Sequence, residues 1–464
     1  MPFFIKNRKR KPEKSQNKKQ RFNDSQNKSD VRKPKKKFLG EELDSDSDIP
    51  SDNEGKKMYS SSEEEEETAQ EKKLRLAKQY LSQIQAEEAE NLEDEEIHRD
   101  IVSHRLKQDI LEQTGRLHKQ VADDYIPPTI DDITVLRGHQ LSVTCIIISS
   151  DSKHIYSGSK DCTIIKWDTQ TCRKVYTVYG GKKNGGEGHS AHVMSLAISS
   201  DGKYLASGDA NKEIHIRNPD TMEKIKVFRG HRNTVSGLAF RKGTHQKGSH
   251  QLFSASHDRA VKIWNLDEMT YVETLYGHED AITSIDSLTR ERAITAGGRD
   301  ASIRIWKIIE ESQLVFHGHM GSIDCVSLIN ETNFVSGGDD NSIALWGVMK
   351  KKPMVLVRNA HSGDSEENSE YWISAVASLQ HTDLIASGSK DGLIRFWKCG
   401  DDFKSLKPIF SLPVTGFVNS LQFSKDGSFL VAGVGQEHKM GRWWRIKEAR
   451  NSICIIKLSK ANEP

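Results

Sequence analysis

One short pattern recurs along the chain at intervals of roughly forty to fifty residues, and this repetition limits the possible folds more than any other feature. The clearest copy is IYSGSKDCTIIKWD at residues 155–168. Five copies place a Gly-His or Ala-His pair, an Asp and a Trp in the same order: Gly138-His139, Asp161 and Trp167; Gly230-His231, Asp258 and Trp264; Gly277-His278, Asp300 and Trp306; Gly318-His319, Asp340 and Trp346; Ala360-His361, Asp391 and Trp397. The chain is therefore a repeat protein.

Two further units are degenerate. In the second unit of the chain, Gly188-His189 leads to SGDANKEIHIRN, in which Asn211 and Arg217 stand at the Asp and Trp positions. The last unit has an alternating strand at 417–423 and an aromatic third strand in RWWRIK at 442–447, but no Gly-His pair precedes them. The sequence therefore predicts seven units.

Each unit alternates apolar or small residues with polar ones over short runs, as IASGSKDGLIRFW at 385–397 shows. Such runs, separated by Asp-Gly-type turns, predict antiparallel strands. A single four-stranded sheet cannot bury both of its faces, so the sheets must stack, and a closed ring leaves only short edges. Residues 131–464 provide about 48 residues per unit. We expect an all-β fold, a seven-bladed propeller.

The Gly-His, Asp and Trp motifs and their period resemble the WD40 family. In that family the His, the turn Asp and the Trp form hydrogen bonds within their own blade, so the resemblance implies that the recurring histidines are scaffold residues. No Ser-His-Asp set, phosphate-binding loop, HExxH motif or paired Cys-x-x-Cys motif stands apart from the repeats. We therefore expect a non-enzymatic binding scaffold without a catalytic site, metal site or cofactor.

Charge is segregated along the chain, although the net charge is only +2. Residues 1–40 contain fifteen Lys or Arg and three acidic residues, whereas residues 41–67 contain twelve acidic residues and two lysines. The six cysteines form no Cys-x-x-Cys pair, which favours a reducing compartment. No apolar run is long enough to span a membrane, and the N-terminus is too basic for a signal peptide. We expect a soluble intracellular protein.

Residues 1–67 are expected to be a disordered tail, basic and then acidic, because they contain too few apolar residues to form a core. Two basic clusters predict a nuclear-import signal or, alternatively, an arm that contacts nucleic acid. Their residues are Lys6, Arg8, Lys9, Arg10, Lys11, Arg32, Lys33, Lys35, Lys36 and Lys37. In the acidic part, Ser45, Ser47 and Ser51 are candidate phosphorylation sites, although a spacer that keeps the basic arm soluble explains the acidic residues equally well.

Residues 68–125 are rich in helix formers, and apolar residues recur there at helical spacing. Such a helical segment either docks on another surface or stands as an isolated charged helix. Ile126-Pro127-Pro128 ends the segment before the propeller at 131–464.

Residues next to the recurring Gly-His pairs and Asp turns are expected to share one end of the ring. The candidates for RNA or partner binding there are Lys160, Arg232, His257, Arg299 and Lys390. Scattered surface cations are the alternative interpretation.

The helical leader and several blade segments also resemble the WD-repeat proteins specific to the U3 small nucleolar ribonucleoprotein. The segments are EEEEETAQEKKLRLAKQYLSQIQ at 63–85, RLKQDILEQTGRLHKQVADD at 105–124, ITAGGRDASIRIWK at 294–307 and ALWGVMKKKP at 344–353. This resemblance implies a nucleolar, monomeric subunit that binds the box B/C element of U3 RNA beside a small kink-turn-binding protein. With other proteins of the small-subunit processome, it would support the early cleavages of precursor ribosomal RNA.

Two other functions are common among WD40 proteins. One is the substrate receptor of a ubiquitin ligase, and the other is a nuclear reader of histones or phosphopeptides. One structural question also stays open, because residues 133–136 and 452–458 could each supply the outermost strand of the last blade.

Overall fold

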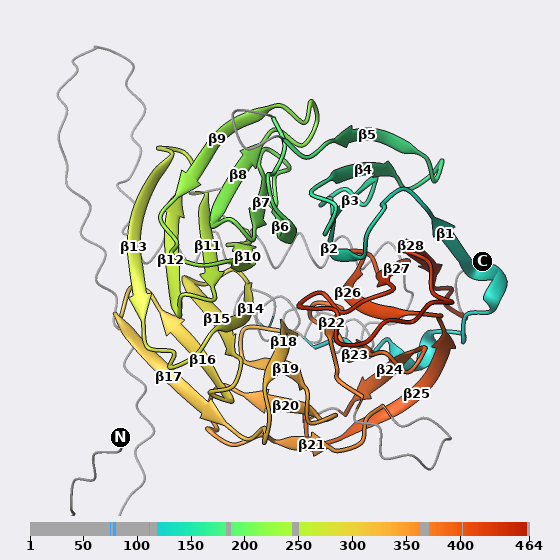
Figure 1. The fold of residues 1–464 in the computed structure, drawn as a ribbon. Coiled ribbons are helices and arrows are strands. Elements are labelled where there is room, and N and C mark those ends of the chain that lie inside the picture. The colour runs from blue at the N-terminus through green and yellow to red at the C-terminus, as the bar shows by residue number, and fades with distance from the viewer. Residues whose placement is uncertain are drawn as a thin grey trace, which may run out of the picture. The chain divides into compact units, whose positions relative to one another are not determined.

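The computed structural model describes residues 118–181, 187–243, 250–361, 371–400 and 402–461, and four single residues at 75, 78, 79 and 111, which are helical. The chain divides into two units, Met1–Arg75 and Leu76–Pro464. In the second unit, seven four-stranded antiparallel sheets form a closed ring, which we number as blades 1 to 7 (Figure 1). The seven-bladed propeller expected from the sequence is confirmed.

Blades 1 to 4 each consist of four consecutive strands. Blade 1 is β2 Val143–Ile148, β3 His154–Ser159, β4 Ile164–Asp168 and β5 Lys174–Val178. Blade 2 is β6 Val193–Ile198, β7 Leu205–Asp209, β8 Glu213–Arg217 and β9 Lys224–Arg229. Blade 3 is β10 Val235–Phe240, β11 Gln251–Ser256, β12 Ala260–Asn265 and β13 Thr270–Tyr276. Blade 4 is β14 Ile282–Ser287, β15 Arg292–Gly297, β16 Ser302–Lys307 and β17 Ser312–His317.

Blades 5 and 6 follow the same order, and blade 7 combines both ends of the ring. Blade 5 is β18 Ile323–Leu328, β19 Asn333–Gly338, β20 Ile343–Gly347 and β21 Val355–Val357. Blade 6 is β22 Ala375–Ser378, β23 Leu384–Gly388, β24 Leu393–Cys399 and β25 Leu406–Pro413. Blade 7 is β26 Phe417–Phe423, β27 Phe429–Gly435, β28 Ser452–Lys457 and β1 Ile133–Leu136.

Blade 7 closes the ring with strands from distant parts of the sequence. β1 pairs antiparallel with β28, from Ile133 opposite Ile456 to Leu136 opposite Ile453. β28 is the third strand of the blade and β1 is the outermost, so both segments that competed for the closing position in the sequence take part. Residues 442–447 (RWWRIK), which the sequence analysis assigned to the third strand, lie instead in the connection between β27 and β28. That assignment was wrong because aromatic content alone does not distinguish a strand from an ordered loop.

The innermost strands link each blade to its neighbour through polar side chains near the start of the strand. The bonds run from Thr144 Oγ1 to Val193 O and from Thr283 Oγ1 to Ile323 O, both 2.5 Å, from Ser374 Oγ to Val418 O at 2.5 Å, and from Asn419 Nδ2 to Val143 O at 2.9 Å. The corresponding residue of blade 5 is Asp324, a buried acid where most blades have a hydroxyl or an amide. Ring closure thus relies on hydrogen bonds between blades as well as on apolar packing.

Residues 118–126, which we call the strap, lie along blades 6 and 7. The backbone N–H groups of Val121 and Ala122 donate to Asp383 Oδ1 at 2.8 and 3.0 Å, and the Tyr125 hydroxyl donates to Gly427 O at 3.0 Å. Ala122 and Tyr125 are buried in the apolar cluster between these two blades. Residues 118–125 were expected to belong to a helical segment, but they form an isolated bridge between Lys119 and Thr382 and a short 3-10 turn, η1 Ala122–Asp124. The carboxylate of Asp383 accepts the N–H groups of Val121 and Ala122, which in a continuous helix would donate to backbone carbonyls of the preceding turn.

Candidate nucleic-acid interface

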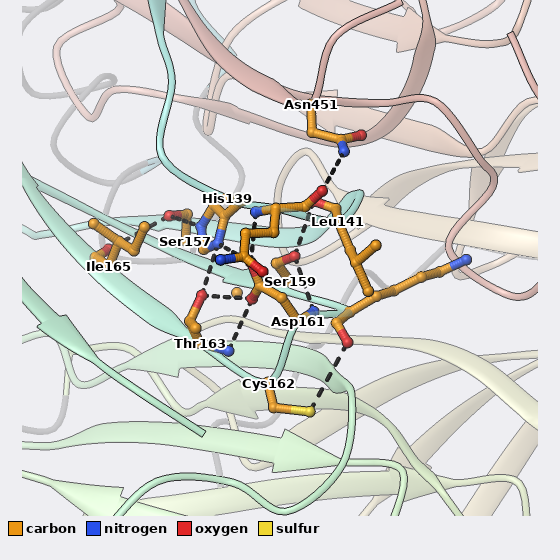
Figure 2. A network of polar contacts seen from close by, with 12 residues as sticks. His139, Leu141, Ser157, Ser159, Asp161, Cys162, Thr163, Ile165 and Asn451 are labelled. Carbon is orange, nitrogen blue, oxygen red and sulfur yellow. Dashed lines mark hydrogen bonds and ion pairs between the residues drawn. The ribbon is translucent and has the colours of Figure 1, made fainter. Parts of the chain in front are cut away.

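The recurring histidines lie in hydrogen-bond chains that begin at the tryptophans. In blade 1 the Trp167 indole N–H donates to Ser157 Oγ at 2.9 Å. Ser157 Oγ lies 2.8 Å from His139 Nε2, and His139 Nδ1 lies 3.3 Å from Asp161 Oδ2; Figure 2 shows these three residues. An indole only donates and a carboxylate only accepts. The hydroxyl therefore donates its proton to Nε2, and Nδ1 donates to the carboxylate. The expected scaffold role of the histidine is confirmed, with a hydroxyl between His and Trp.

The same chain recurs in blades 3 to 6 and fixes the Asp turns at one end of the ring, which we call the histidine end. In blade 3, Trp264 donates to Ser254 at 2.8 Å, and His231 lies 2.7 Å from Ser254 and 3.0 Å from Asp258. Burial opposes ionisation of Asp258, but hydrogen bonds from His231 and from the Arg232 backbone outweigh it and lower its pKa to about 2. The carboxylate therefore stays charged and holds the turn.

Blade 2 differs from the expected pattern in the residue that binds its histidine. His189 Nδ1 lies 3.0 Å from Asp209 Oδ2, so Asp209 takes the role that the sequence alignment gave to Asn211. The Asn211 side chain instead donates to Ser190 Oγ at 2.7 Å. Arg217 does occupy the Trp position, where it is buried and donates to Met222 O at 3.1 Å and to Glu187 O. The carboxylate has moved two residues along the chain, which motif spacing alone could not reveal.

Three buried side chains of blade 2 lie close enough together to be considered as ligands of a metal ion. The ligand atoms of His189, Asp209 and His215 lie within 4.8 Å of one another. The two imidazole rings are stacked, however, with centroids 3.9 Å apart and an interplanar angle of 18°. Imidazole lone pairs lie in the ring plane, so nearly parallel rings cannot direct them at one ion. The nearby Arg217 guanidinium also disfavours a cation, and this cluster does not suit a metal.

The same cluster predicts that stability falls in mild acid. Burial, with the neighbouring His189, lowers the pKa of His215 from 6.5 to about 4. Between these values the unfolded chain binds a proton that the folded chain excludes, so the free energy of unfolding decreases as the pH falls from 6.5 to 4. At about 1.4 kcal/mol per pKa unit, we expect a loss of about 1–3 kcal/mol.

Denaturant unfolding at several pH values measures this loss. The matched variant is His215→Ile, because Ile165 occupies the equivalent position of blade 1. This variant should lose less stability across the window, and an equal slope in both proteins would contradict the role of His215.

The long connection between β27 and β28, residues 436–451, crosses the histidine end, and we call it the blade 7 loop. Its ends are fixed to each other and to blade 1, since Gln436 N–H donates to Asn451 Oδ1 at 3.0 Å and Asn451 Nδ2 donates to Gln140 O at 3.0 Å. Farther along, Lys439 Nζ donates to two carbonyl groups. One is Ser374 O, in the residue just before β22 of blade 6, at 3.2 Å, and the other is Asp324 O of blade 5, at 3.4 Å. The loop is therefore anchored to several blades.

The blade 7 loop brings together four of the five predicted binding residues. Lys160 is buried beneath it and donates to His438 O at 2.7 Å, so this lysine supports the loop and does not extend into solvent. His257 and Arg299 line a pocket with His438, and Lys390 Nζ lies 3.9 Å from the centroid of Trp444. Contacts between Lys160 and a residue 278 positions away cannot be inferred from the repeat pattern.

Exposed groups on the histidine end are suited to RNA. Arg232 and Arg299 are exposed, and their contact with phosphate remains a prediction. The sequence analysis missed Arg442, Trp443 and Arg445 of the blade 7 loop, which are also exposed, with 63% of the Trp443 surface accessible. Their signal was the RWWR run, which was assigned to a strand. Guanidinium groups beside an accessible indole can bind phosphate and stack on an unpaired base.

Several predictions concern residues outside the described part of the chain. The tail at 1–67 lies there, with its import clusters and its candidate phosphorylation sites Ser45, Ser47 and Ser51, and these remain predictions. Among the described residues, no helix has the length and apolar character needed to cross a membrane. All six cysteines are free thiols, and burial raises the pKa of Cys145 and Cys325 to about 12.

Comparison with known proteins places these features in a family. The family model described as "WD domain, G-beta repeat" matches seven segments: 131–168, 182–218, 222–265, 269–307, 310–347, 360–398 and 406–441. "U3 small nucleolar RNA-interacting protein 2" of Mus musculus is 55% identical over 398 residues, which cover 85% of this chain and 83% of the mouse protein. "Ribosomal RNA-processing protein 9" of Saccharomyces cerevisiae is 26% identical over 555 residues, covering 90% of this chain and 95% of the yeast protein.

A solved structure is similar to this chain in both sequence and fold. "Structure of U3-55K" is 55% identical and superposes with a TM-score of 0.68, covering 71% of this chain and 100% of that chain.

Proposed function

Because the chain belongs to the WD40-repeat family and, within it, to the U3 small nucleolar RNA-interacting proteins, we propose that it is a non-enzymatic subunit of the U3 small nucleolar ribonucleoprotein. It binds the box B/C region of U3 RNA together with a small kink-turn-binding protein. Through this particle and other proteins of the small-subunit processome, it supports the early cleavages of precursor ribosomal RNA that lead to 18S RNA. The names of the mouse and yeast relatives support a role with U3 RNA and in ribosomal RNA processing.

Nucleolar localisation is part of the proposal. The basic clusters at 6–11 and 32–37 would act as the import signal. The free cysteines agree with a reducing nuclear compartment.

The exposed cationic groups at the histidine end are the observation that carries RNA binding. Arg232 comes from the loop before blade 3 and Arg299 from the Asp turn of blade 4, so both lie at the same end of the ring as the blade 7 loop. Since the described ring carries no RNA-recognition motif of another fold, we expect recognition through phosphate charge, RNA shape and base stacking.

Charge reversal of Arg232 and Arg299 tests this surface. The double variant Arg232→Glu/Arg299→Glu should bind a box B/C RNA fragment, in the presence of the kink-turn-binding protein, at least about tenfold more weakly at physiological salt. The slope of log affinity against log salt should decrease by about 2, one for each lost phosphate contact. Fluorescence anisotropy or filter binding measures both quantities.

The matched control is Lys350→Glu/Lys351→Glu, which reverses two exposed charges in the turn between β20 and β21 of blade 5. This control should bind the RNA as tightly as the native chain. Equal affinities of all three proteins would contradict RNA binding at the histidine end. Immunoprecipitation followed by RNA sequencing tests the particle itself: enrichment of U3 RNA supports the proposal, whereas ubiquitin-ligase subunits or histones without U3 RNA would contradict it.

A further inference from the structure

A pocket of about 580 Å³ opens at the histidine end between the blade 7 loop and blades 3 to 6. Its lining combines tryptophans, of which Trp443 also belongs to the RNA-binding surface described above, with carboxylates, which that surface does not require. The residues that define its chemistry are Asp280, Asp324, Asp339, Trp372, Trp443 and Trp444. We call it the acid-aromatic pocket.

Tryptophans from two blades form one wall of the acid-aromatic pocket. The ring of Trp372 lies 5.9 Å from that of Trp443 and 4.9 Å from that of Trp444, both in edge-to-face geometry. The Lys390 ammonium lies 3.9 Å from the Trp444 centroid, so a cation already occupies one face of this cluster. Trp443, the most exposed of the three, still offers an accessible indole surface.

Three carboxylates and a single guanidinium, that of Arg299, line the pocket. Asp280 Oδ2 accepts the Arg299 backbone N–H at 3.2 Å. Asp324 is the acid that replaces the hydroxyl or amide found on most inner strands, and burial, opposed by Lys439 but assisted by Asp339, raises its pKa to about 6. Arg299 and Lys439 together offset two of the three carboxylate charges. The lining therefore keeps an excess of one negative charge.

One more group in the lining has unused hydrogen-bonding capacity. His438 is 2% exposed, and within the described part of the chain its Nε2 has no hydrogen-bond partner. Its other nitrogen, Nδ1, accepts the Met440 N–H at 3.3 Å, so Nε2 carries the proton in the neutral ring. Burial lowers the pKa of His438 to about 3, and the ring is neutral at physiological pH. This N–H thus lacks an acceptor within the described part of the chain, at a residue that lines the pocket.

We propose that the acid-aromatic pocket binds an arginine side chain on an extended segment of a partner protein. A guanidinium group matches the lining in two ways, because it forms paired hydrogen bonds with carboxylates and stacks its flat face on an indole. A phosphate would meet the carboxylates of Asp280, Asp324 and Asp339, so the charge of the lining disfavours RNA as the occupant. The proposal goes beyond RNA binding and does not depend on it.

A pair of short capped peptides tests the proposal on the full chain without RNA. One peptide carries a single central arginine and the other carries citrulline, which has nearly the same shape without the charge. The arginine peptide should bind about tenfold more tightly or better, and its binding should change the tryptophan fluorescence. Isothermal titration calorimetry gives the affinities, and a fluorescence titration shows whether the tryptophans sense the peptide.

Two variants and a control locate the binding site. Asp280→Asn/Asp339→Asn should weaken the arginine peptide about tenfold, and Trp443→Ala should weaken it and reduce the fluorescence change. The control Glu279→Gln/Glu311→Gln removes the same charge from two exposed residues outside the lining and should bind normally.

Three results would overturn the proposal: equal binding of the arginine and citrulline peptides, no binding of either, or unchanged binding by the aspartate variant. The aspartate variant should also retain its affinity for the box B/C RNA. Weaker RNA binding by this variant would assign the pocket to RNA and would likewise reject the arginine site. Failure of the Arg232 and Arg299 test would leave the peptide result unaffected, so the two proposals fail separately.

Discussion

Replacing Trp346 with alanine should lower the free energy of unfolding by about 3–5 kcal/mol, the range typical of large aromatic residues in a protein core. Trp346 is completely buried in the cluster between blades 4 and 5, with its ring stacked on Phe334 at a centroid distance of 5.9 Å. Its indole N–H also donates to Ser336 Oγ at 2.8 Å. The substitution therefore leaves a cavity and removes the donor at the start of the blade 5 hydrogen-bond chain. Urea unfolding followed by circular dichroism measures the loss.

The matched control is Trp443→Ala, which removes the same side chain from the exposed blade 7 loop. With 63% of its surface accessible, Trp443 contributes little apolar burial, and its loss should change stability by less than about 0.5 kcal/mol. Similar losses in the two variants would contradict the distinction between a tryptophan that holds blades together and one that faces a ligand.

Removing β1 should lower the free energy of unfolding by about 4 kcal/mol or more. β1 supplies the outer ladder of blade 7 and buries Leu136 against the cluster shared with blade 1. A fully buried leucine contributes about 2 kcal/mol and each ladder hydrogen bond about 1 kcal/mol. Loss of β1 also exposes the unpaired edge of β28, which favours aggregation.

Two chains isolate this effect, one beginning at Asp131 and the other at Gly138. They differ only in residues 131–137, which are β1 and the residues next to it, and both lack the strap, so the strap does not contribute to the difference. Thermal and urea unfolding give the two stabilities. A synthetic peptide of residues 131–137 should restore part of the loss by pairing with β28, and equal stability of the two chains would show that β1 does not close the ring.

Local spacing in the sequence predicted the fold and the scaffold contacts within each blade. His139, Ser157 and Asp161 lie on adjacent strands and turns of one repeat, so the repeat itself brings them together. Where the spacing changed, the prediction failed: the blade 2 carboxylate at Asp209 lies two residues before the expected Asn211. The carboxylate that binds the histidine can come from the last residue of a strand, as Asp209 does, or from the turn after it. The motif alone does not show which of these two positions contacts the histidine.

The interface was harder to predict because its contacts join distant repeats. Lys160 was expected at the surface, since the residue before an Asp turn normally faces solvent. It is buried because the blade 7 loop crosses above it and provides the acceptor His438 O. The acid-aromatic pocket likewise depends on the loop that carries Trp443 and Trp444, which the sequence analysis assigned to a strand. Only the path of that loop assembles the site.

The pairing of β1 with β28 also has a consequence for protein synthesis. Among the described strands β1 leaves the ribosome first, but its partner residues 453–456 are translated more than 300 residues later. At translation rates of about 5–20 residues per second, β1 waits roughly 15–60 s for its partner. During this time blades 1 to 6 can form, while β1 remains an unpaired strand. A nascent chain thus completes the ring only after β28 has been translated.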